Sequence, residues 1–206
     1  RGERFSVTTR DDGSDIELTL NLFGQHNVQN ALAALAVGLE LGVDIETISQ
    51  ALGKFQGIDR RFQVTEKIEI NHTTLTIIDD YGHHPNELSA VFKTIRNHWK
   101  DRRLCAVFQP HRYSRTEALF DDFVTVLSDV DALVLLEVYS AGEAVVTDAD
   151  SKSLARAVRA RQRVTPILVE NLDQARETIE EIIEDDDILV FLGAGSISGL
   201  VREFLS

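Results

Sequence analysis

Apolar residues recur in the early part of the chain at two spacings, which predict two kinds of element. Residues 4–10 and 16–22 alternate apolar with polar positions, and the Asp-Asp-Gly-Ser sequence between them is a strong turn signal, so a β-hairpin is predicted. Residues 28–39 and 44–52 show the spacing of helices with one apolar face, and Gly42 ends the first of them. We expect these elements to be the last part of a domain.

Residues 53–61 contain two glycines, interrupt this periodicity and are the best candidate for a linker. Beyond them, predicted strands and helices alternate. The strands are at residues 62–70, 74–79, 104–109, 132–138, 166–169 and 188–192, and the helices are at residues 85–99, 117–130, 151–161 (capped by Ser151), 172–184 and up to residue 205. This order favours an α/β fold with a mostly parallel, doubly wound sheet.

The stretch at residues 77–85, I-I-D-D-Y-G-H-H-P, joins the end of an apolar strand to two carboxylates, a phenol and two imidazoles. In open α/β sheets, ligands bind beyond the carboxyl ends of the strands, so this position suits a binding site. Side chains alternate along a strand, so Asp79 and Asp80 are expected to point to opposite sides. Only one of them is then expected to face a ligand, and the other to cap the following turn.

A second strand end carries the sequence Q-P-H-R-Y-S-R at residues 109–115. The two strand ends together would place imidazoles, a phenol and two arginines in one crevice. Arg112 and Arg115 are three residues apart and would bind an anion, because guanidinium groups pair bidentately with carboxylate and phosphate.

Less specific interpretations of the same residues stay open. Asn27 alone would be an N-cap, and His26 a cap or a packed residue. Arg60 and Arg61 would be solvated linker residues, and the acidic run at residues 180–187 a solvated helix end. His83, His84 and His111 would suit a metal, yet no closed ligand spacing is present. Gly193 and Gly195 resemble part of a dinucleotide loop only weakly, and would also permit a tight turn.

Composition narrows the class of protein. The chain has 206 residues, of which 43% are hydrophobic, and a formal net charge of -13, which opposes binding to nucleic acids and to anionic membranes. No apolar run reaches the roughly 20 residues of a membrane span, and no signal peptide follows Arg1, so we expect a cytoplasmic protein. Cys105 is the single cysteine and is expected to be a small buried hydrophobe. Because the chain starts without Met, inside a predicted strand, it is expected to be a piece of a longer protein.

Five motifs, in order, resemble those of the Mur ligases. They are G-Q-H-N-V-Q-N-A-L-A-A (24–34), F-Q-G-I-D-R-R-F (55–62), D-D-Y-G-H-H-P (79–85), F-Q-P-H-R-Y-S-R-T (108–116) and G-A-G-S-I-S (193–198). The resemblance covers nearly all of the chain from Gly24 onward. It implies that residues 1–56 are the end of a central ATP-binding domain and residues 57–206 a C-terminal Rossmann-like ligase domain.

The resemblance also implies a reaction. In it, ATP with Mg²⁺ converts the carboxylate of UDP-N-acetylmuramate to an acyl phosphate, which the amine of L-alanine attacks during peptidoglycan precursor synthesis. Asn27 and Asn30 resemble the pair that lies against adenine, Arg61 the arginine that reaches the phosphates, and Asp80 the acid on the ribose side. The residues that resemble the wall facing the muramate and alanine groups are Tyr81, His83, His111, Arg112 and Arg115. No catalytic residue and no metal ligand is assigned.

The phosphate loop and the carbamylated lysine of the Mur ligases are absent from this sequence, in which no G-K-[ST] occurs. The isolated chain is therefore predicted to be inactive and to need the missing N-terminal and central domains, closing on a hinge near Gly57. Three alternatives stay open: a ligase that recycles a tripeptide onto the same nucleotide sugar, a non-catalytic nucleotide-binding module, and a metal hydrolase.

Overall fold

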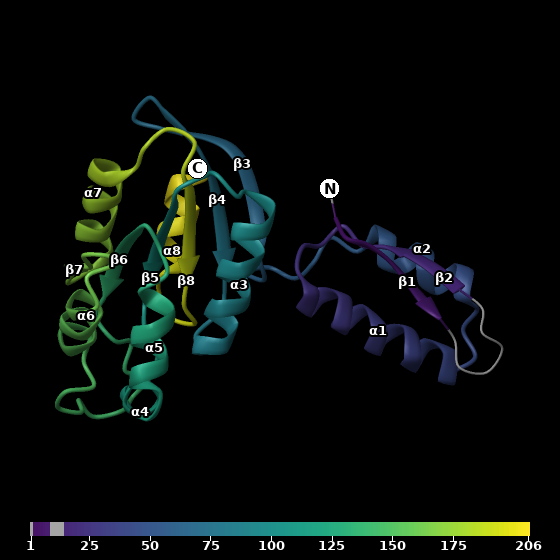
Figure 1. Ribbon diagram of the computed structural model, residues 1–206, viewed down its shortest axis with the longest axis horizontal. Helices are drawn as coiled ribbons and strands as arrows, with labels where there is room; N and C mark the ends of the chain where they lie inside the picture. The colour runs from purple at the N-terminus through teal and green to yellow at the C-terminus, as the bar shows by residue number, and fades with distance from the viewer. Residues whose placement is uncertain (1, 9–14) are drawn as a thin grey trace. The chain divides into compact units, whose positions relative to one another are not determined.

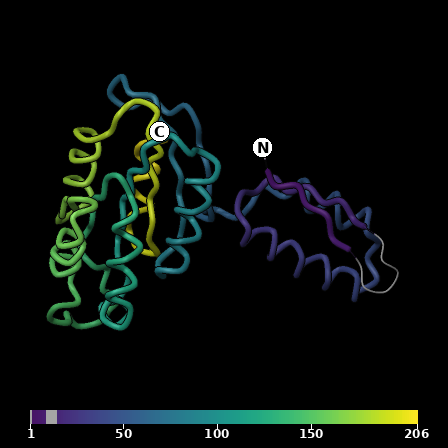
Figure 2. The backbone as a smooth tube through the Cα atoms, viewed as in Figure 1, coloured from purple at the N-terminus to yellow at the C-terminus, as the bar shows by residue number. Residues whose placement is uncertain are grey.

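The computed structural model describes residues 2–8 and 15–206. The chain divides into two compact units, Arg1–Asp59 and Arg60–Ser206, which we call the N-terminal and the C-terminal unit. Figures 1 and 2 trace the first in purple to blue and the second in blue to yellow.

The N-terminal unit is a β-hairpin with two helices. Its elements are β1 (Arg4–Thr8), β2 (Asp15–Thr19), α1 (Gln25–Glu40) and α2 (Ile45–Lys54). The strands pair antiparallel, with Phe5 opposite Leu18, which confirms the predicted strands, while the predicted turn at residues 11–14 lies outside the described residues. A small core forms where side chains of β2, α1 and α2 meet, at Ile16, Leu18, Leu35 and Ile48.

The prediction of Asn27 as an N-cap is wrong. Gly24 is the N-cap of α1, with a φ of 96° that suits glycine. Asn27 lies inside the first turn, where its side-chain amide donates to the carbonyl oxygen of Phe23 over 2.9 Å. The amide therefore holds the chain that enters the helix, rather than accepting a bond from the helix backbone.

The C-terminal unit is built on a six-stranded sheet with the order β3-β4-β8-β5-β6-β7. The strands are β3 (Gln63–Ile70), β4 (Thr73–Asp80), β5 (Leu104–Phe108), β6 (Ala132–Leu136), β7 (Ile167–Val169) and β8 (Ile188–Leu192). Only β3 runs antiparallel to its neighbour, so the predicted mostly parallel sheet is confirmed. Every residue of β5 and β8 is buried, as expected for central strands covered on both faces.

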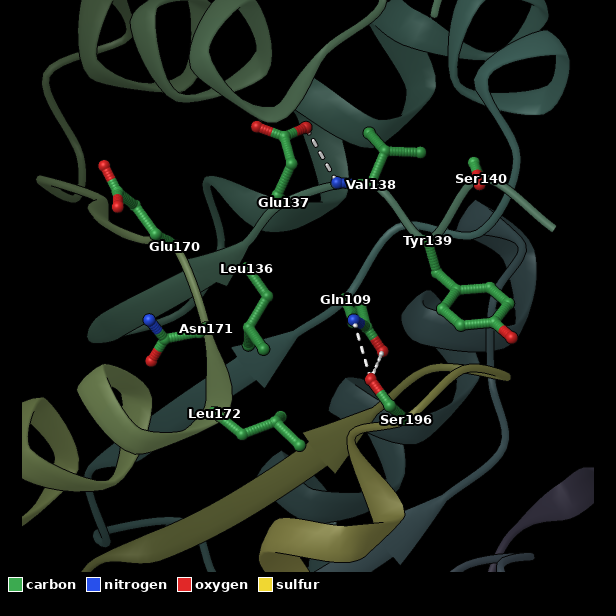
Figure 3. Close-up of a pocket in the computed structure, with 10 residues that line it drawn as sticks. All are labelled: Gln109, Leu136, Glu137, Val138, Tyr139, Ser140, Glu170, Asn171, Leu172 and Ser196. Carbon is green, nitrogen blue, oxygen red and sulfur yellow. Dashed lines mark hydrogen bonds between the residues drawn. The ribbon is translucent and has the colours of Figure 1, made fainter. Parts of the chain in front are cut away.

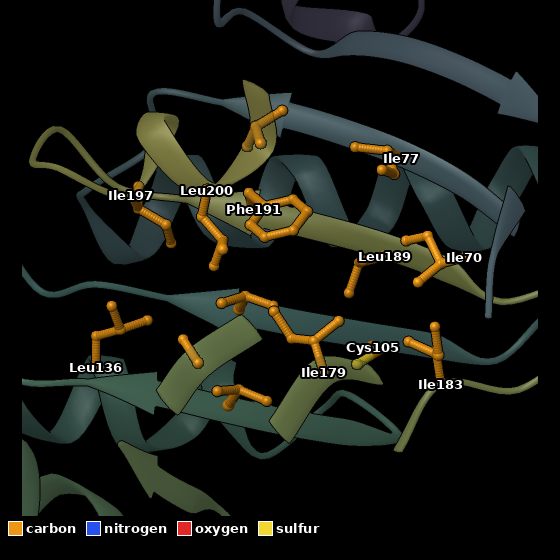
Figure 4. Packing of buried hydrophobic residues seen from close by; sticks show 14 of the residues in the cluster. Ile70, Ile77, Cys105, Leu136, Ile179, Ile183, Leu189, Phe191, Ile197 and Leu200 are labelled. Atoms are coloured by element: carbon orange, nitrogen blue, oxygen red, sulfur yellow. The ribbon is translucent and has the colours of Figure 1, made fainter. Parts of the chain in front are cut away.

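Helices cover both faces of this sheet (Figure 1). They are α3 (Pro85–His98), α4 (Tyr113–Ala118), α5 (Phe120–Leu127), α6 (Ser151–Ala160), α7 (Leu172–Ile182) and α8 (Ser198–Phe204). Side chains of α7 and α8 pack with Ile77, Leu189 and Phe191 on one face (Figure 4). On the other face, α5 is anchored by Phe123, whose ring centre lies 5.6 Å from that of Phe108.

Cys105 belongs to the cluster of Figure 4 and is fully buried. Burial raises the pKa of its thiol to about 12, so the thiol stays protonated. The predicted role of a small buried hydrophobe is confirmed. None of the helices in the described part of the chain has the length and apolar character that crossing a bilayer requires.

Two helix boundaries differ from the prediction. The helix expected at residues 117–130 begins earlier and breaks at Leu119, where φ is -120°, so it forms α4 and α5. The N-cap of α6 is Asp150, which accepts from the backbone N–H of Ser153 over 2.7 Å, rather than Ser151. The hydroxyl of Ser151 instead donates to the carbonyl oxygen of Leu136 over 2.7 Å and so ties the helix to β6.

The acidic run at residues 180–187 is not solvated throughout. Asp187 is only 1% exposed and accepts from Nη1 of Arg103 over 2.7 Å and from the backbone N–H of Glu184 over 2.9 Å. Burial raises the pKa of Asp187 above its ordinary value, against the opposing effect of these two partners. The carboxylate therefore depends on Arg103 for its charge compensation.

Replacing Arg103 by methionine should destabilise the C-terminal unit, because it leaves Asp187 buried without its cation. Breaking a buried pair costs about 3–5 kcal/mol, and we expect roughly 2–3 kcal/mol here because Arg103 is partly exposed. Urea unfolding followed by Trp99, the single tryptophan, measures the change. The matched control is Arg163→Met, whose 2.6 Å pair with Asp129 is exposed at both ends and should matter by less than about 1 kcal/mol. Equal effects of the two substitutions would contradict the prediction.

Candidate functional site

The carboxyl ends of β4, β8, β5 and β6 meet at one edge of the sheet, because these strands are parallel. The loops that follow bring four rings into a continuous line, which we call the aromatic row: Tyr81, His83, His111 and Tyr139. Successive ring centres along it are 5.5 Å, 6.0 Å and 5.4 Å apart. The two predicted strand ends thus do come together, as the sequence indicates.

Asp79 and Asp80 are both buried at the end of β4 but have different partners. One oxygen of Asp80 accepts from the backbone N–H of Phe62 over 2.8 Å, and the other accepts from that of Gly82 over 2.7 Å. An oxygen of Asp79 instead lies 3.9 Å from Nε of Arg60. Burial raises the pKa of Asp80, while the two N–H bonds oppose the shift. Asp80 is therefore the residue that fixes the turn after the strand.

Glu87 fixes the start of α3, immediately after this turn. Its Oε2 accepts from the backbone N–H groups of His83 and His84 over 2.9 Å and 3.1 Å, and Pro85 occupies the first turn. Burial alone would raise the pKa of Glu87. The N–H bond and charge of His83, with the N–H of His84 and the charge of Arg61, outweigh burial and lower it. The carboxylate is thus held ionised beside the His83 ring.

His111 contacts a guanidinium group, that of Arg115, and an aromatic ring, that of Tyr139. Nη1 of Arg115 is 3.3 Å from Nδ1 of His111 and 3.0 Å from its carbonyl oxygen. The ring stacks on Tyr139 with an angle of 13° between the planes. Burial, and then the charges of Arg115, His83 and Arg112, lower the pKa of His111. The imidazole is therefore neutral at pH 7.

Arg60 and Arg61 lie close to the Tyr81 ring, with their Cζ atoms 4.9 Å and 5.3 Å from its centre. Arg60 donates from Nη2 to the carbonyl oxygen of Gly193 over 2.6 Å, and its side chain is 23% exposed. The interpretation of Arg60 as a solvated linker residue is therefore wrong. Arg61 is 52% exposed, and its Nη1 lies 4.0 Å from Oε1 of Glu87. Of the two, Arg61 is the cation available to a ligand.

Arg112 and Arg115 differ in the same way. The side chain of Arg112 is 51% exposed, and its Nη1 lies 3.9 Å from Oε1 of Glu143. Arg115 points back to His111. Arg112 also has a φ of 73°, in the left-handed region that residues other than glycine seldom adopt. Strained backbone of this kind clusters at functional sites.

The glycine turn after β8 packs tightly against the loops from β5 and β6. A Cβ on Gly195 would lie 2.5 Å from Oε1 of Gln109 and 2.9 Å from Cγ of Tyr139. Gln109 cannot move away freely, because its Oε1 accepts from the backbone N–H of Ile197. The glycine therefore permits a close approach that positions Gln109 and Tyr139.

A pocket of about 380 Å³ is lined in part by Tyr139, the last ring of the aromatic row (Figure 3). Its lining residues are Gln109, Leu136, Glu137, Val138, Tyr139, Ser140, Glu170, Asn171, Leu172 and Ser196. Gln109 and Ser196 are joined in its wall by a hydrogen bond of 3.3 Å. Tyr139 belongs both to the pocket and to the aromatic row, so the two features are continuous.

Asn27 and Asn30 lie in the N-terminal unit, on α1. They are three residues apart and share one face of the helix. Asn30 is exposed. Asn27 is partly buried, and its side chain donates to the carbonyl oxygen of Phe23. Among residues 2–8 and 15–206, no group of three or more His, Cys, Asp or Glu side chains is arranged to hold a metal ion.

Tyr139, Glu87 and Glu143 also belong to this edge and were not predicted from the sequence. Tyr139 lies three residues beyond the apolar strand β6, and Tyr81 directly follows β4, so a position soon after a parallel strand was an available signal. Glu143 gave no such signal. It accepts from the backbone and hydroxyl of Ser114 over 3.0 Å and 2.7 Å, a contact that only the folded loops create.

Comparison with known proteins identifies similar chains. The family described as "Mur ligase, glutamate ligase domain" matches residues 60–195. The UDP-N-acetylmuramate–L-alanine ligases of Methylococcus capsulatus and Halorhodospira halophila are 50% and 52% identical over 97% and 92% of this chain. The crystal structure of the UDP-N-acetylmuramate-alanine ligase of Thermotoga maritima is 27% identical, with a TM-score of 0.78 over 98% of this chain. The chain spans 42%, 39% and 42% of these three proteins.

Alanine at position 195 should disturb this edge, because its Cβ would overlap Gln109 and Tyr139. Overpacking of this kind costs about 1–3 kcal/mol, and we expect Gly195→Ala to lower the stability of the C-terminal unit by that amount. The control is Gly199→Ala in α8, where a Cβ would meet only Cδ1 of Leu172 at 3.9 Å. Urea unfolding of both variants distinguishes them, and a Gly195→Ala protein as stable as the control would refute the close approach.

Proposed function

Because the chain belongs to the Mur ligase family, we propose that it forms part of an ATP-dependent ligase that joins L-alanine to UDP-N-acetylmuramate in peptidoglycan precursor synthesis. The observation that carries this proposal is the aromatic row with its arginines. It gathers polar residues from separate family motifs at one sheet edge, where a doubly wound fold binds its ligands.

The row and its arginines suit two anionic substrates. Muramate and alanine each carry a carboxylate, and Arg112 offers an exposed guanidinium beside the neutral ring of His111. In the proposed reaction the muramate carboxylate becomes an acyl phosphate, and the alanine amine then attacks its carbonyl carbon. Tyr81, His83, His111, Arg112 and Arg115 would orient these groups for the attack.

ATP is the proposed co-substrate of this ligase. ATP supplies the phosphoryl group that activates the carboxylate. Asn27 and Asn30 offer amide edges that suit adenine, and Arg61 has the exposure that a phosphate contact requires. Asp80 would act on the ribose side chiefly by fixing the turn at residues 81–83, since both of its oxygens already accept backbone bonds. Mg²⁺ would accompany the ATP phosphates, and most of its ligands are proposed to lie outside this chain.

We propose further that residues 1–56 complete an ATP-binding domain and that residues 57–206 form the ligase domain of a longer protein. The partial coverage of the relatives supports this division, as does the family match that starts at residue 60. The sequence contains no G-K-[ST] phosphate loop. Without this loop, the isolated chain has Arg61 as a proposed phosphate contact but lacks the backbone loop that would hold the transferring phosphate.

The isolated chain should release no phosphate from ATP in the presence of UDP-N-acetylmuramate and L-alanine. A longer protein that carries the upstream domains should form the alanyl product under the same conditions. Phosphate release and product chromatography measure both. Turnover by the isolated chain would show that its phosphate-binding residues lie within these 206 residues.

Substitutions of Arg60 and Arg61 in the full-length ligase should have different effects, one on stability and the other on the use of ATP. Arg61→Ala should lower kcat/KM for ATP roughly 10- to 100-fold, the loss expected for a charge-assisted contact, with unfolding unchanged. Arg60→Ala should lower stability, because it removes the bond to Gly193. Steady-state kinetics and urea unfolding test both variants, and an Arg61→Ala enzyme with unchanged use of ATP would exclude Arg61 from the nucleotide site.

A further inference from the structure

The protonation of His83 is set by its neighbours. Its Nδ1 lies 3.0 Å from the carbonyl oxygen of Tyr81, and a carbonyl can only accept, so Nδ1 carries the hydrogen. The carboxylate of Glu87, 3.7 Å from the same nitrogen, favours the same arrangement. In the neutral ring, the lone pair is therefore on Nε2.

The protonation of His111 is set in the opposite sense. Nη1 of Arg115 lies 3.3 Å from Nδ1 of His111, and a guanidinium can only donate, so Nδ1 carries the lone pair. The hydrogen of the neutral ring is then on Nε2. Both rings are only partly buried, which leaves them accessible to a ligand at the sheet edge.

Tyr139 fixes the plane of the His111 ring. The two rings stack at 5.4 Å. The backbone of Tyr139 is held on both sides of this stack, since its N–H donates to the carbonyl oxygen of Pro110 and its carbonyl oxygen accepts from the N–H of Arg112, each over 2.8 Å. The direction of the His111 Nε2–H bond is therefore built into the loop.

We propose that His83 and His111 work as a complementary pair in opposite tautomers, with Nε2 of His83 as the proton acceptor and Nε2–H of His111 as the hydrogen-bond donor for acyl transfer. The two rings are neighbours in the aromatic row, with centres 6.0 Å apart. The assignment of this chemistry to the pair rests on the proposed ligase function, whereas the tautomers rest on the contacts of Arg115, Tyr81 and Glu87 alone.

The proposed acyl transfer begins with a proton transfer to His83. The ammonium group of the amino acid gives one proton to Nε2 of His83 and becomes a neutral amine. The amine lone pair forms the C–N bond at the acyl carbon while His111 Nε2–H donates to the acyl oxygen, where negative charge develops. The C–O bond to phosphate then breaks, and the phosphate leaves with that electron pair and takes the second proton from nitrogen.

Nitrogen NMR of the ¹⁵N-labelled chain tests the tautomers without any activity. Protonated and unprotonated ring nitrogens have distinct shifts, and His83→Gln and His111→Gln assign the two rings by loss of their signals. At a pH where both rings are neutral, we expect the hydrogen on Nδ1 of His83 and on Nε2 of His111. The reverse tautomer in either ring would overturn the proposal.

Arg115→Leu tests the cause of the His111 tautomer. Loss of the donor should let the hydrogen appear on Nδ1 and should raise the pKa of His111, because the charge of Arg115 lowers it. Arg163→Met, which removes an exposed arginine bonded to Asp129, is the control and should leave both rings unchanged. The backbone amide spectrum verifies that each variant is folded. An unchanged His111 ring in a folded Arg115→Leu chain would refute the role of Arg115.

Kinetics of the full-length ligase test the chemistry. His83→Gln should lower kcat by about 10²- to 10⁴-fold, the range of a lost general base, with partial rescue by added imidazole. His111→Gln keeps an N–H donor and should retain more activity than His111→Ala. If His83→Gln keeps full activity, the acceptor role is wrong. If the full-length protein forms no amide while the tautomers are as stated, the ligase function fails and the tautomer assignment stands.

Discussion

Parallel pairing of β8 with both β4 and β5 is the constraint on which the site depends. Leu192 at the end of β8 pairs with Asp80 on one side and with Phe108 on the other, and Phe108 pairs in turn with Leu135 of β6. The four strands therefore end within about one residue of the same level. The loops that follow these strands therefore start at the same edge of the sheet. Residues far apart in the chain become neighbours there.

The same pairing continues into the loops as single hydrogen bonds. Gln109 donates its backbone N–H to the carbonyl oxygen of Leu192, and Gly193 donates to that of Asp80. Each polar loop thus starts from backbone that is already fixed. Rings placed on such loops lose little further conformational freedom when a ligand arrives, which favours precise positioning over adaptability.

Much of this architecture could be predicted from the sequence, because strand and helix periodicity is local information. The sheet edge could be predicted as well, since polar residues directly follow the apolar strands β4 and β5. The break at Leu119, the cap at Asp150 and the different environments of Arg60 and Arg61 could not. Each depends on a partner remote in sequence or on competition between adjacent residues, as in the bond from Arg60 to Gly193.

The bonds of Asp80 have a mechanical consequence. Asp80 accepts from the N–H of Phe62, and Tyr81 donates its N–H to the carbonyl oxygen of Arg60 over 2.7 Å. The first residues of the C-terminal unit and the turn that carries Tyr81 and His83 are thereby one cooperative piece. Local opening that begins at the entrance to this unit would dismantle half of the aromatic row while the buried strands β5 and β8 remain intact. The turn that carries Tyr81 and His83 is thus expected to open more readily than the central strands on which it is built.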